Sequence, residues 1–316
     1  MSNNAKPYET WRYFALALDP IHVGTGGYRL GRVDMSIVRE PGTNVPKIPG
    51  TSIAGACRTY ATMQTPDRWP DCAGQGQPVE KRKYKGHCGD PNCPICVTFG
   101  FSRGDKSFQG LAQFSDARLV LFPVHSLAGP VWVTCADALN ALEEFEQSKW
   151  QDLPKNELVG TKANLLNGNR LNLGWLMLQK DETEFDLSGK LPDVPSEILD
   201  RAVLVSNKMF GHIVNDNLEV RTSVSIDPQT GAAAEGALFT YEALPRASVL
   251  AFEVVISDPK FYKIDGEEPL RNKGGKGTVK NTVEGGLRFF EALGVGGMNT
   301  RGMGRLRVLG LQSGGA

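Results

Sequence analysis

The sequence lacks an excess of charge of either sign, because 35 lysine and arginine residues balance 35 aspartate and glutamate residues. This balance argues against binding of polyanions through a general positive field, although local arginines and backbone donors can still form such a site. No run of about 18 apolar residues occurs, so we expect no transmembrane helix and no membrane partner. The N-terminus also lacks a charged and then apolar signal pattern, which predicts a cytoplasmic protein.

The sequence is poor in cysteine as well. Its six cysteines favour free thiols or a metal site over disulfide bonds, because no secretory signal is present. With 316 residues, of which 41% are hydrophobic, the chain is long enough to bury a full core. Its 36 glycines lie in clusters without a fixed period, which argues against a collagen-like or low-complexity chain.

The first glycine cluster lies between two predicted strands. Gly24, Gly26 and Gly27 follow an apolar strand, as they would in a dinucleotide site. Arg29, however, occupies the position of the third glycine in the pattern G-x-G-x-x-G. The next segment, Val33–Glu40, alternates like a strand instead of forming the helix that such a site requires. These differences argue against a dinucleotide-binding loop.

The same loop carries polar side chains that are suited to phosphate chemistry. Free backbone N–H groups and the guanidinium groups of Arg29 and Arg32 can bind phosphate oxygens. Asp34, at the start of the next strand, can hold a metal ion or accept a proton, and His22 lies just before the glycines. The alternative is a solvated loop in which Asp34 only satisfies its own turn.

A Pro/Gly-rich connection leads into a short predicted helix that begins with Thr51 or Ser52 as its cap. Apolar residues recur at helical spacing up to Tyr60. Arg58 lies on the flank of this helix and is its best candidate for a phosphate contact. A surface ion pair is the simpler alternative for Arg58.

A cysteine-rich stretch follows this helix. The segment G-H-C-G-D-P-N-C-P-I-C places His87, Cys88, Cys93 and Cys96 within ten residues and has little apolar sequence of its own. This density of ligands predicts a structural zinc site. Because the adjacent His87 and Cys88 fit one tetrahedron poorly, Cys72 is a substitute for either of them. The alternative is a cluster of reduced thiols.

The C-terminal half contains a predicted hairpin and a second glycine cluster. Glu219–Ile226 alternates cleanly and Ala237–Glu242 returns after a turn, which predicts a long hairpin. A basic loop, Lys273–Lys280, precedes a predicted helix over Thr282–Leu293. Gly294–Val308 then forms a glycine-rich loop and a last strand, and this loop is a candidate second wall of the phosphate-binding groove.

Three of these segments resemble the start of a RAMP protein, one of the RNA-binding subunits of CRISPR effector complexes: I-H-V-G-T-G, V-D-M-S-I-V-R-E and I-P-G-T-S-I-A-G-A-C-R. Phe114–Cys135 further resembles the backbone subunit of the type III-B (Cmr) complex, and the resemblance covers essentially the whole chain. It implies an α+β fold of the ferredoxin-like or RRM type. Residues 1–316 would form a single RAMP domain, with a zinc knuckle inserted at about 66–100 and a β-hairpin thumb projecting at about 205–247. An ordinary edge hairpin is the alternative to the thumb.

The resemblance also implies a function. Subunits of this family stack along a guide (CRISPR) RNA and cut the complementary target RNA, so both RNAs, further copies of the chain and other type III-B subunits are expected partners. Asp34 matches the family's catalytic acid, which implies Mg²⁺ or Mn²⁺ beside the structural Zn²⁺. His22 is a candidate helper, with a structural turn histidine as its alternative, and Tyr241 and Glu242 are weaker candidates. The residues expected to bind RNA are Gly24, Gly26, Gly27, Arg29, Arg32, Ser52, Arg58, Gly296, Gly297 and Arg301.

Two other functions fit the same residues. One is an RNA-binding scaffold whose nuclease activity is lost or supplied by another subunit, although Asp34 argues against it. The other is a guide-RNA-processing endonuclease, which needs a general acid/base pair for metal-independent attack by a 2′-hydroxyl. Only His22 lies near the loop to serve in such a pair. Sensitivity of cleavage to EDTA distinguishes these functions.

Overall fold

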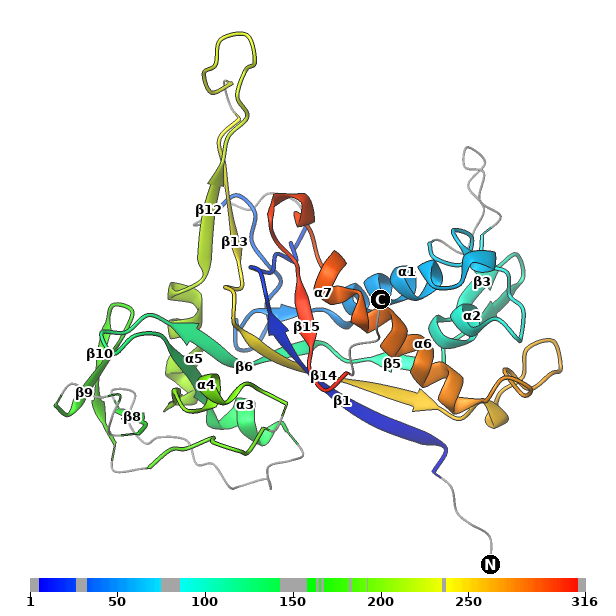
Figure 1. Cartoon of the computed structure of the whole chain (residues 1–316), viewed down its shortest axis with the longest axis horizontal. Helices are drawn as coiled ribbons and strands as arrows, with labels where there is room; N and C mark the ends of the chain where they lie inside the picture. Colours follow the sequence, from blue (N-terminus) through cyan, green and yellow to red (C-terminus); the bar gives the residue numbers. More distant parts are fainter. Residues whose placement is uncertain are drawn as a thin grey trace, which may run out of the picture.

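The computed structural model describes residues 6–26, 33–74, 86–142, 158–162, 165, 168–181, 184–191, 193–234 and 237–311. Eleven strands among these residues form one sheet: β1 (Tyr8–Ala17), β2 (Lys47–Ile48), β5 (Ala112–Phe114), β6 (Ala117–Val124), β7 (Val131–Cys135), β8 (Leu158–Gly160), β9 (Arg170–Leu173), β10 (Leu176–Lys180), β11 (Ala202–Val205), β14 (Val249–Ser257) and β15 (Leu306–Val308). Their order is β15-β1-β14-β6-β7-β11-β8-β10-β9, with β2 beside β6 and β5 beside β14. The fold is therefore mixed α+β, as expected (Figure 1).

Four neighbouring strands, β15, β1, β14 and β6, are antiparallel throughout. The chain forms α1 (Gly50–Met63) between β1 and β6, and α6 (Lys276–Arg288) between β14 and β15. Both helices pack on one face of the sheet, in a core that includes Tyr13 and Phe252. The two helices approach so closely at Gly286 that a Cβ there would lie 2.3 Å from the Cys57 carbonyl oxygen, and this contact therefore requires glycine.

The other strands extend the sheet into a second lobe, at the left of Figure 1, which also contains α3 (Ala136–Asn140), α4 (Ser196–Leu199) and α5 (Asn207–Asp216). A second apolar core joins this lobe to the other face of β1 and β14 through Phe14, Leu139 and Ile198. None of the helices in the described part of the chain has the length and apolar content needed to span a bilayer.

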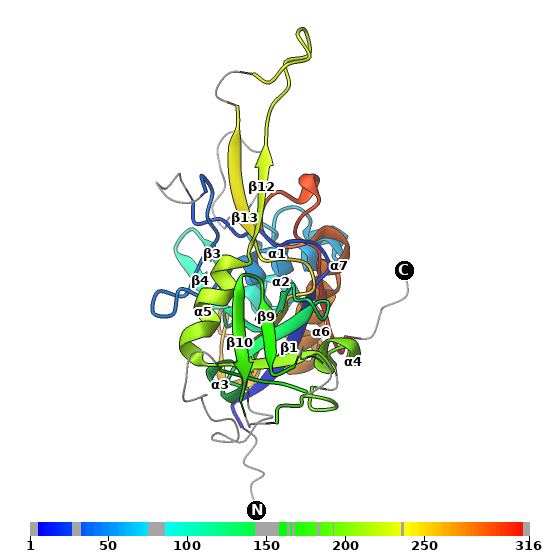
Figure 2. The ribbon, with the colours of Figure 1, turned by 90° about the vertical axis from the view of Figure 1, so that its left-hand side faces the viewer.

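The predicted long hairpin is confirmed. It consists of β12 (Glu219–Ser223) and β13 (Phe239–Ala243), which form a two-stranded sheet of their own. A further bridge between Ile226 and Ala233 continues the ribbon toward its tip. Figures 1 and 2 show, from two directions, that this hairpin stands away from the body of the molecule.

The cysteine-rich stretch lies beside α1 and α6 at the opposite end of the molecule from the second lobe. It contains the 3-10 helix η1 (Pro66–Arg68), α2 (Pro94–Phe99), and a small hairpin of β3 (Phe101–Arg103) and β4 (Lys106–Phe108). The helix α2 contacts both α1 and α6, so the stretch packs on the helical layer.

Two expectations for the N-terminal half were wrong. Val33–Glu40 is not a regular strand, because its bridges go to different segments: Met35 to Tyr241, Ile37 to Gly24 and Arg39 to Pro46. Neither Thr51 nor Ser52 caps α1. The helix begins at Gly50 after Pro49 and has no side-chain cap, because both hydroxyl residues already lie in its first turn.

A boundary in the C-terminal half was also wrong. The segment expected to be a basic loop enters α6 at Lys276, and the expected helix over Thr282–Leu293 is divided into α6 and α7 (Phe290–Leu293). Val279 and Val283 are both buried one turn apart. Their burial stabilises the extra helical turn, despite the glycines that favour a loop.

Candidate functional site

Asp34 lies at the foot of the projecting hairpin, where its segment crosses β13. Met35 N donates to Thr240 O at 3.1 Å, which holds the two segments together. The Asp34 carboxylate oxygen Oδ2 accepts hydrogen bonds from Thr240 N at 2.7 Å and Thr240 Oγ1 at 2.9 Å. These two bonds hold the pKa of the exposed Asp34 below its usual value, and the bond from the backbone N–H has the larger influence. Asp34 is therefore an accessible carboxylate that is ionised at neutral pH and fixed in position.

The two glycine clusters meet near Asp34. Gly297 N donates to His22 O at 2.8 Å, and Gly24 bridges to Ile37 on the segment that carries Asp34. This approach requires glycine, since a Cβ on Gly296 would lie 2.5 Å from His22 O. The first and last glycine clusters therefore lie side by side, and their role as two walls of one phosphate-binding groove stays a prediction.

His22 is buried between these segments, with 5% of its surface exposed. Its Nδ1 lies 2.7 Å from Glu242 O. Because a carbonyl can only accept, Nδ1 is the donor of this bond. The ring meets Tyr241 edge-on, with 6.1 Å between centroids. His22 therefore ties the first glycine cluster to β13.

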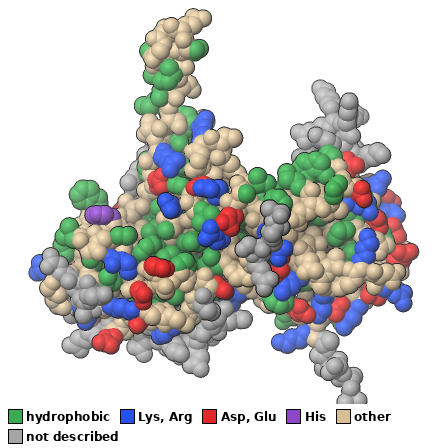
Figure 3. Space-filling view, viewed as in Figure 1, with side chains coloured by type: hydrophobic (Ala, Val, Ile, Leu, Met, Phe, Trp, Pro, Cys, Tyr) green, Lys and Arg blue, Asp and Glu red, His purple; other side chains and the backbone are tan. Residues whose placement is uncertain are grey.

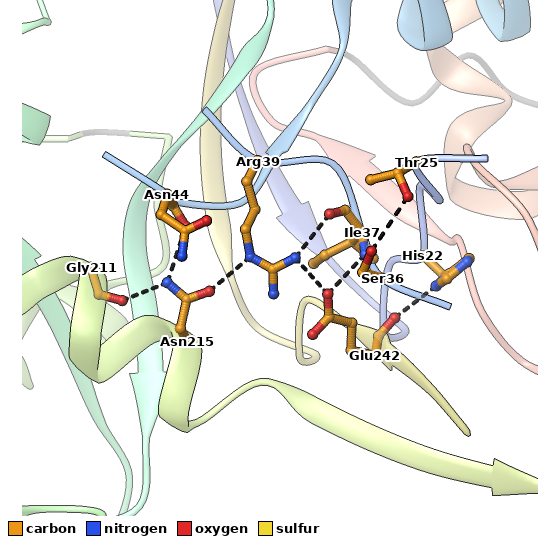
Figure 4. Close-up of polar contacts among 9 residues, drawn as sticks. All are labelled: His22, Thr25, Ser36, Ile37, Arg39, Asn44, Gly211, Asn215 and Glu242. Carbon is orange, nitrogen blue, oxygen red and sulfur yellow. Dashed lines mark hydrogen bonds and ion pairs between the residues drawn. The ribbon is translucent and has the colours of Figure 1, made fainter. Parts of the chain in front are cut away.

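Glu242 belongs to a chain of polar contacts that runs from β13 to α5 (Figure 4). Its Oε1 accepts a hydrogen bond from Ile37 N at 2.9 Å. The same oxygen forms an ion pair with Arg39 Nη1 at 2.6 Å. Arg39 Nε in turn donates to Asn215 Oδ1 at 2.9 Å. Because its carboxylate is buried and already engaged, Glu242 acts as a clamp for the Asp34 segment, which favours a structural role over the catalytic role predicted from the sequence.

Tyr241 is also at the foot of the hairpin, but its side chain is 3% exposed. It packs with Ala243 and Met303, and its hydroxyl lies 3.4 Å from Ser223 Oγ. This environment indicates a packing role for the ring.

The remaining expected RNA contacts differ in how far the structure describes them. Arg301 is exposed, and its guanidinium lies 5.2 Å from the centroid of the Phe239 ring at the base of the hairpin. Figure 3 shows several lysine and arginine side chains gathered around this base. Gly24 and Gly26 are exposed, whereas Ser52 is half-buried in the first turn of α1. Three expected contacts lie outside the described residues: Gly27, Arg29 and Arg32.

Arg58 is half-buried and its guanidinium is bonded within the protein, which argues against a phosphate contact. Its Nε donates to Cys72 O at 2.7 Å and its Nη1 donates to Gly100 O at 2.9 Å. Burial is the largest influence on its pKa and lowers it. The flank of α1 that carries Arg58 is covered by the cysteine-rich stretch, which the local sequence pattern does not reveal.

Four cysteines converge in that stretch. The sulfur atoms of Cys72, Cys88, Cys93 and Cys96 all lie within 4.8 Å of one another. Cys96 Sγ is 3.6 Å from Cys88 Sγ and 3.7 Å from Cys72 Sγ. Zn–S bonds of about 2.3 Å place the sulfurs of a tetrahedron about 3.8 Å apart, so this spacing fits zinc.

His87 is not part of this cluster. Its Nε2 lies 2.8 Å from Gly74 O, and its Nδ1 accepts a hydrogen bond from Ser102 N at 3.3 Å. With both ring nitrogens engaged, His87 is corrected to a structural residue. Cys72, named from the sequence as a substitute ligand, takes its place in the cluster.

Two contributors to the Asp34 site were not predicted. Thr240 anchors the carboxylate, and Arg39 pairs with Glu242. Both belong to segments that the sequence singled out, but no local pattern indicates where their side chains point.

The chain belongs to the RAMP superfamily, whose family model matches residues 15–307. Among characterised relatives it is similar to the CRISPR system Cmr endoribonuclease Cmr4 of Pyrococcus furiosus. The two are 24% identical over 309 residues, which cover 84% of this chain and 93% of the relative.

Solved structures show the same fold. A chain of the type III-B Cmr-beta complex bound to cognate target RNA aligns with a TM-score of 0.65 and 14% identity, covering 96% of this chain and 98% of that one. Oligomeric Cmr4 from Pyrococcus furiosus aligns with a TM-score of 0.59 and 18% identity, covering 95% and 98%.

Proposed function

We propose that this chain is a backbone subunit of a type III-B CRISPR (Cmr) complex, which binds guide RNA and cleaves the paired target RNA. The observation that carries the proposal is the exposed Asp34 carboxylate, anchored by Thr240 near the meeting point of the two glycine clusters. Membership of the RAMP superfamily and similarity to a protein named as a Cmr endoribonuclease support the same conclusion.

Asp34 is the residue suited to hold the metal. Its Oδ1 takes part in neither bond to Thr240, so it can act as a ligand while Oδ2 keeps the side chain in place. A bound Mg²⁺ or Mn²⁺ would stabilise charge on the scissile phosphate and help to activate the attacking hydroxyl or water. One carboxylate is a sparse ligand set for such a cation, so RNA phosphate oxygens would complete it.

His22 fits a positioning role better than proton transfer. Its ring is buried and donates from Nδ1 to the Glu242 carbonyl, which fixes the turn that precedes the first glycine cluster. Substitution of His22 should therefore affect cleavage less than substitution of Asp34.

RNA would be bound through its sugar–phosphate backbone. The joined glycine clusters offer main-chain N–H groups, and Arg301 adds a positive charge at the base of the hairpin. Neither feature distinguishes one base from another, so base pairing between guide and target would supply the sequence specificity.

The strand topology supports the assignment of a single RAMP domain. The strand order β15-β1-β14-β6, with α1 and α6 on one face, has the connectivity of a ferredoxin-like domain. We assign the chain to a single RAMP domain with the cysteine-rich stretch and the hairpin as insertions.

We further propose that several copies assemble. A repeated head-to-tail contact between copies would generate a filament along the guide RNA, capped by other type III-B subunits.

A structural zinc ion is proposed for the cysteine cluster. Its four sulfurs have the spacing of a tetrahedral site, and Cys72, Cys93 and Cys96 are fully buried. Such a closed site would hold Zn²⁺ and would crosslink the stretch to itself without taking part in catalysis.

The function is tested by cleavage in the assembled complex, with a guide RNA and a complementary target RNA. We expect cleavage with Mg²⁺ or Mn²⁺ and none after EDTA treatment. Cleavage that persists in EDTA would favour a guide-processing type of endonuclease. Target binding without cleavage under any metal condition would favour an RNA-binding scaffold.

A further inference from the structure

The guanidinium of Arg58 is incompletely paired in the interior. Its Nε and Nη1 are bonded to Cys72 O and Gly100 O, but its Nη2 is buried and has no hydrogen-bond partner among the described residues. A buried, unsatisfied donor on a charged group is costly. Such an atom calls for a specific explanation, for example an ion that completes its environment.

The cysteine cluster can supply the negative counter-charge that the Arg58 guanidinium lacks. The Arg58 guanidinium lies against this cluster, because its Nε donates at 2.7 Å to the backbone carbonyl of Cys72, one of the four clustered cysteines. Four thiolates around one Zn²⁺ leave an excess of negative charge. Arg68 is a second arginine in this region and forms an ion pair with Asp90 at 2.8 Å. A positive group on the buried side of the cluster is therefore complementary to a zinc tetrathiolate.

We infer that Arg58 is a positioning and charge-compensating residue of the metal site, whose Nη2 donates a hydrogen bond to a zinc-bound thiolate. The inference rests on the zinc proposal made above. Partners of this kind hold metal ligands in orientation and stabilise their charged form.

This arrangement couples the metal to the core of the protein. Arg58 is part of α1, while its two bonded carbonyls belong to Cys72, a member of the cysteine cluster, and to Gly100, at the C-terminal end of α2. When zinc is bound, the guanidinium is compensated and α1 is linked to the cysteine-rich stretch. When zinc is removed, the thiols take up protons, the guanidinium loses its counter-charge, and this contact with α1 weakens.

The test compares zinc affinity among three variants of the full chain by competition with a chromogenic chelator. Arg58→Met removes the charge, and Arg58→Lys keeps it without the planar fork. Arg12→Met is the control, because Arg12 is a half-buried arginine on β1 whose Nε is bonded to Glu253 at 3.1 Å. We expect Arg58→Met to bind zinc about 10–100-fold more weakly than wild type. Arg58→Lys should lose less, and Arg12→Met should bind as wild type does.

Each result has a defined meaning. Wild-type protein without zinc would reject the zinc proposal and this inference with it. Zinc-loaded wild type with equal affinity in Arg58→Met would overturn only the role of Arg58. An equal loss in Arg12→Met would also overturn it, because the effect would then be general destabilisation.

Hydrogen exchange of the wild-type protein provides a second measurement that remains valid if Arg58→Met does not fold. Removal of zinc should accelerate amide exchange in the part of α1 around Arg58. Unchanged exchange of α1 with and without zinc would contradict the coupling.

Discussion

The Asp34 site and the cysteine cluster, the two cation sites that we propose, differ in exposure and in the number of ligands. Asp34 is a single exposed carboxylate, fixed through one of its two oxygens. The cluster brings four sulfurs within 4.8 Å of one another, three of them from fully buried residues. An incomplete site leaves coordination positions for a substrate, whereas a closed site serves only the fold. Under our proposal, the first region therefore serves the reaction and the second serves stability.

The largest effect should come from opening the closed site. Cys96→Ser removes a sulfur ligand, so zinc should be lost and the free energy of unfolding should fall by about 3 kcal/mol or more. Metal analysis together with thermal unfolding measures both effects. Cys57→Ala is the control, since Cys57 is buried outside the cluster and its loss should leave zinc bound. A Cys96→Ser protein that is zinc-free and fully stable would show that the cluster is only a set of thiols.

A smaller effect should follow from breaking the clamp behind the open site. Arg39→Met leaves the buried Glu242 carboxylate without its cation, which should destabilise the fold by about 3 kcal/mol. Cleavage should also fall, because the Asp34 segment loses one of its anchors. Urea denaturation measures the first effect. Arg307→Met is the matched control: its ion pair with Glu291 is exposed, and its loss should cost less than about 1 kcal/mol. Equal losses in the two variants would contradict the clamp.

Arg301→Gln should weaken guide-RNA binding without affecting the cysteine cluster. If Arg301 contacts one phosphate, the affinity should fall to a similar degree for unrelated guide sequences. The slope of log K against log salt should become less negative by about 0.7. Binding measured over a range of salt concentrations gives both values. A loss confined to one guide sequence would indicate recognition of base edges.

The smallest effect is expected from Thr240→Val, which removes the hydroxyl bond to Asp34 and keeps the backbone bond. Both bonds lower the pKa of Asp34, so the variant's pKa should rise toward the usual value. The wild-type carboxylate stays ionised to lower pH, and the variant should therefore lose cleavage at a higher pH as the medium is acidified. The pH profile of cleavage shows this shift, and an acid limb that does not move would contradict the role of Thr240.

The sequence predicted features that depend on local pattern. The glycine clusters, the cysteine spacing and the alternation of the hairpin strands each leave a signature within a short segment. The sequence also pointed to Asp34 through the segment in which it lies. Its exposure, however, is known only from the structure.

The remaining features depend on contacts between distant residues. Arg39 and Glu242 are separated by 203 positions, and Asp34 and Thr240 by 206. No local periodicity encodes such pairs. Arg58 shows the same limit, because the flank of a helix looks alike whether solvent or another segment covers it.

The central claim is tested most directly by Asp34→Asn in the assembled complex with magnesium present. The substitution keeps the size of the side chain and removes the charge that, in our proposal, holds a divalent cation. Target-RNA cleavage should fall more than about a hundredfold, which corresponds to about 3 kcal/mol of barrier, while guide binding, assembly and target capture stay intact. Cleavage at the wild-type rate by Asp34→Asn would contradict the account and leave the chain as an RNA-binding scaffold.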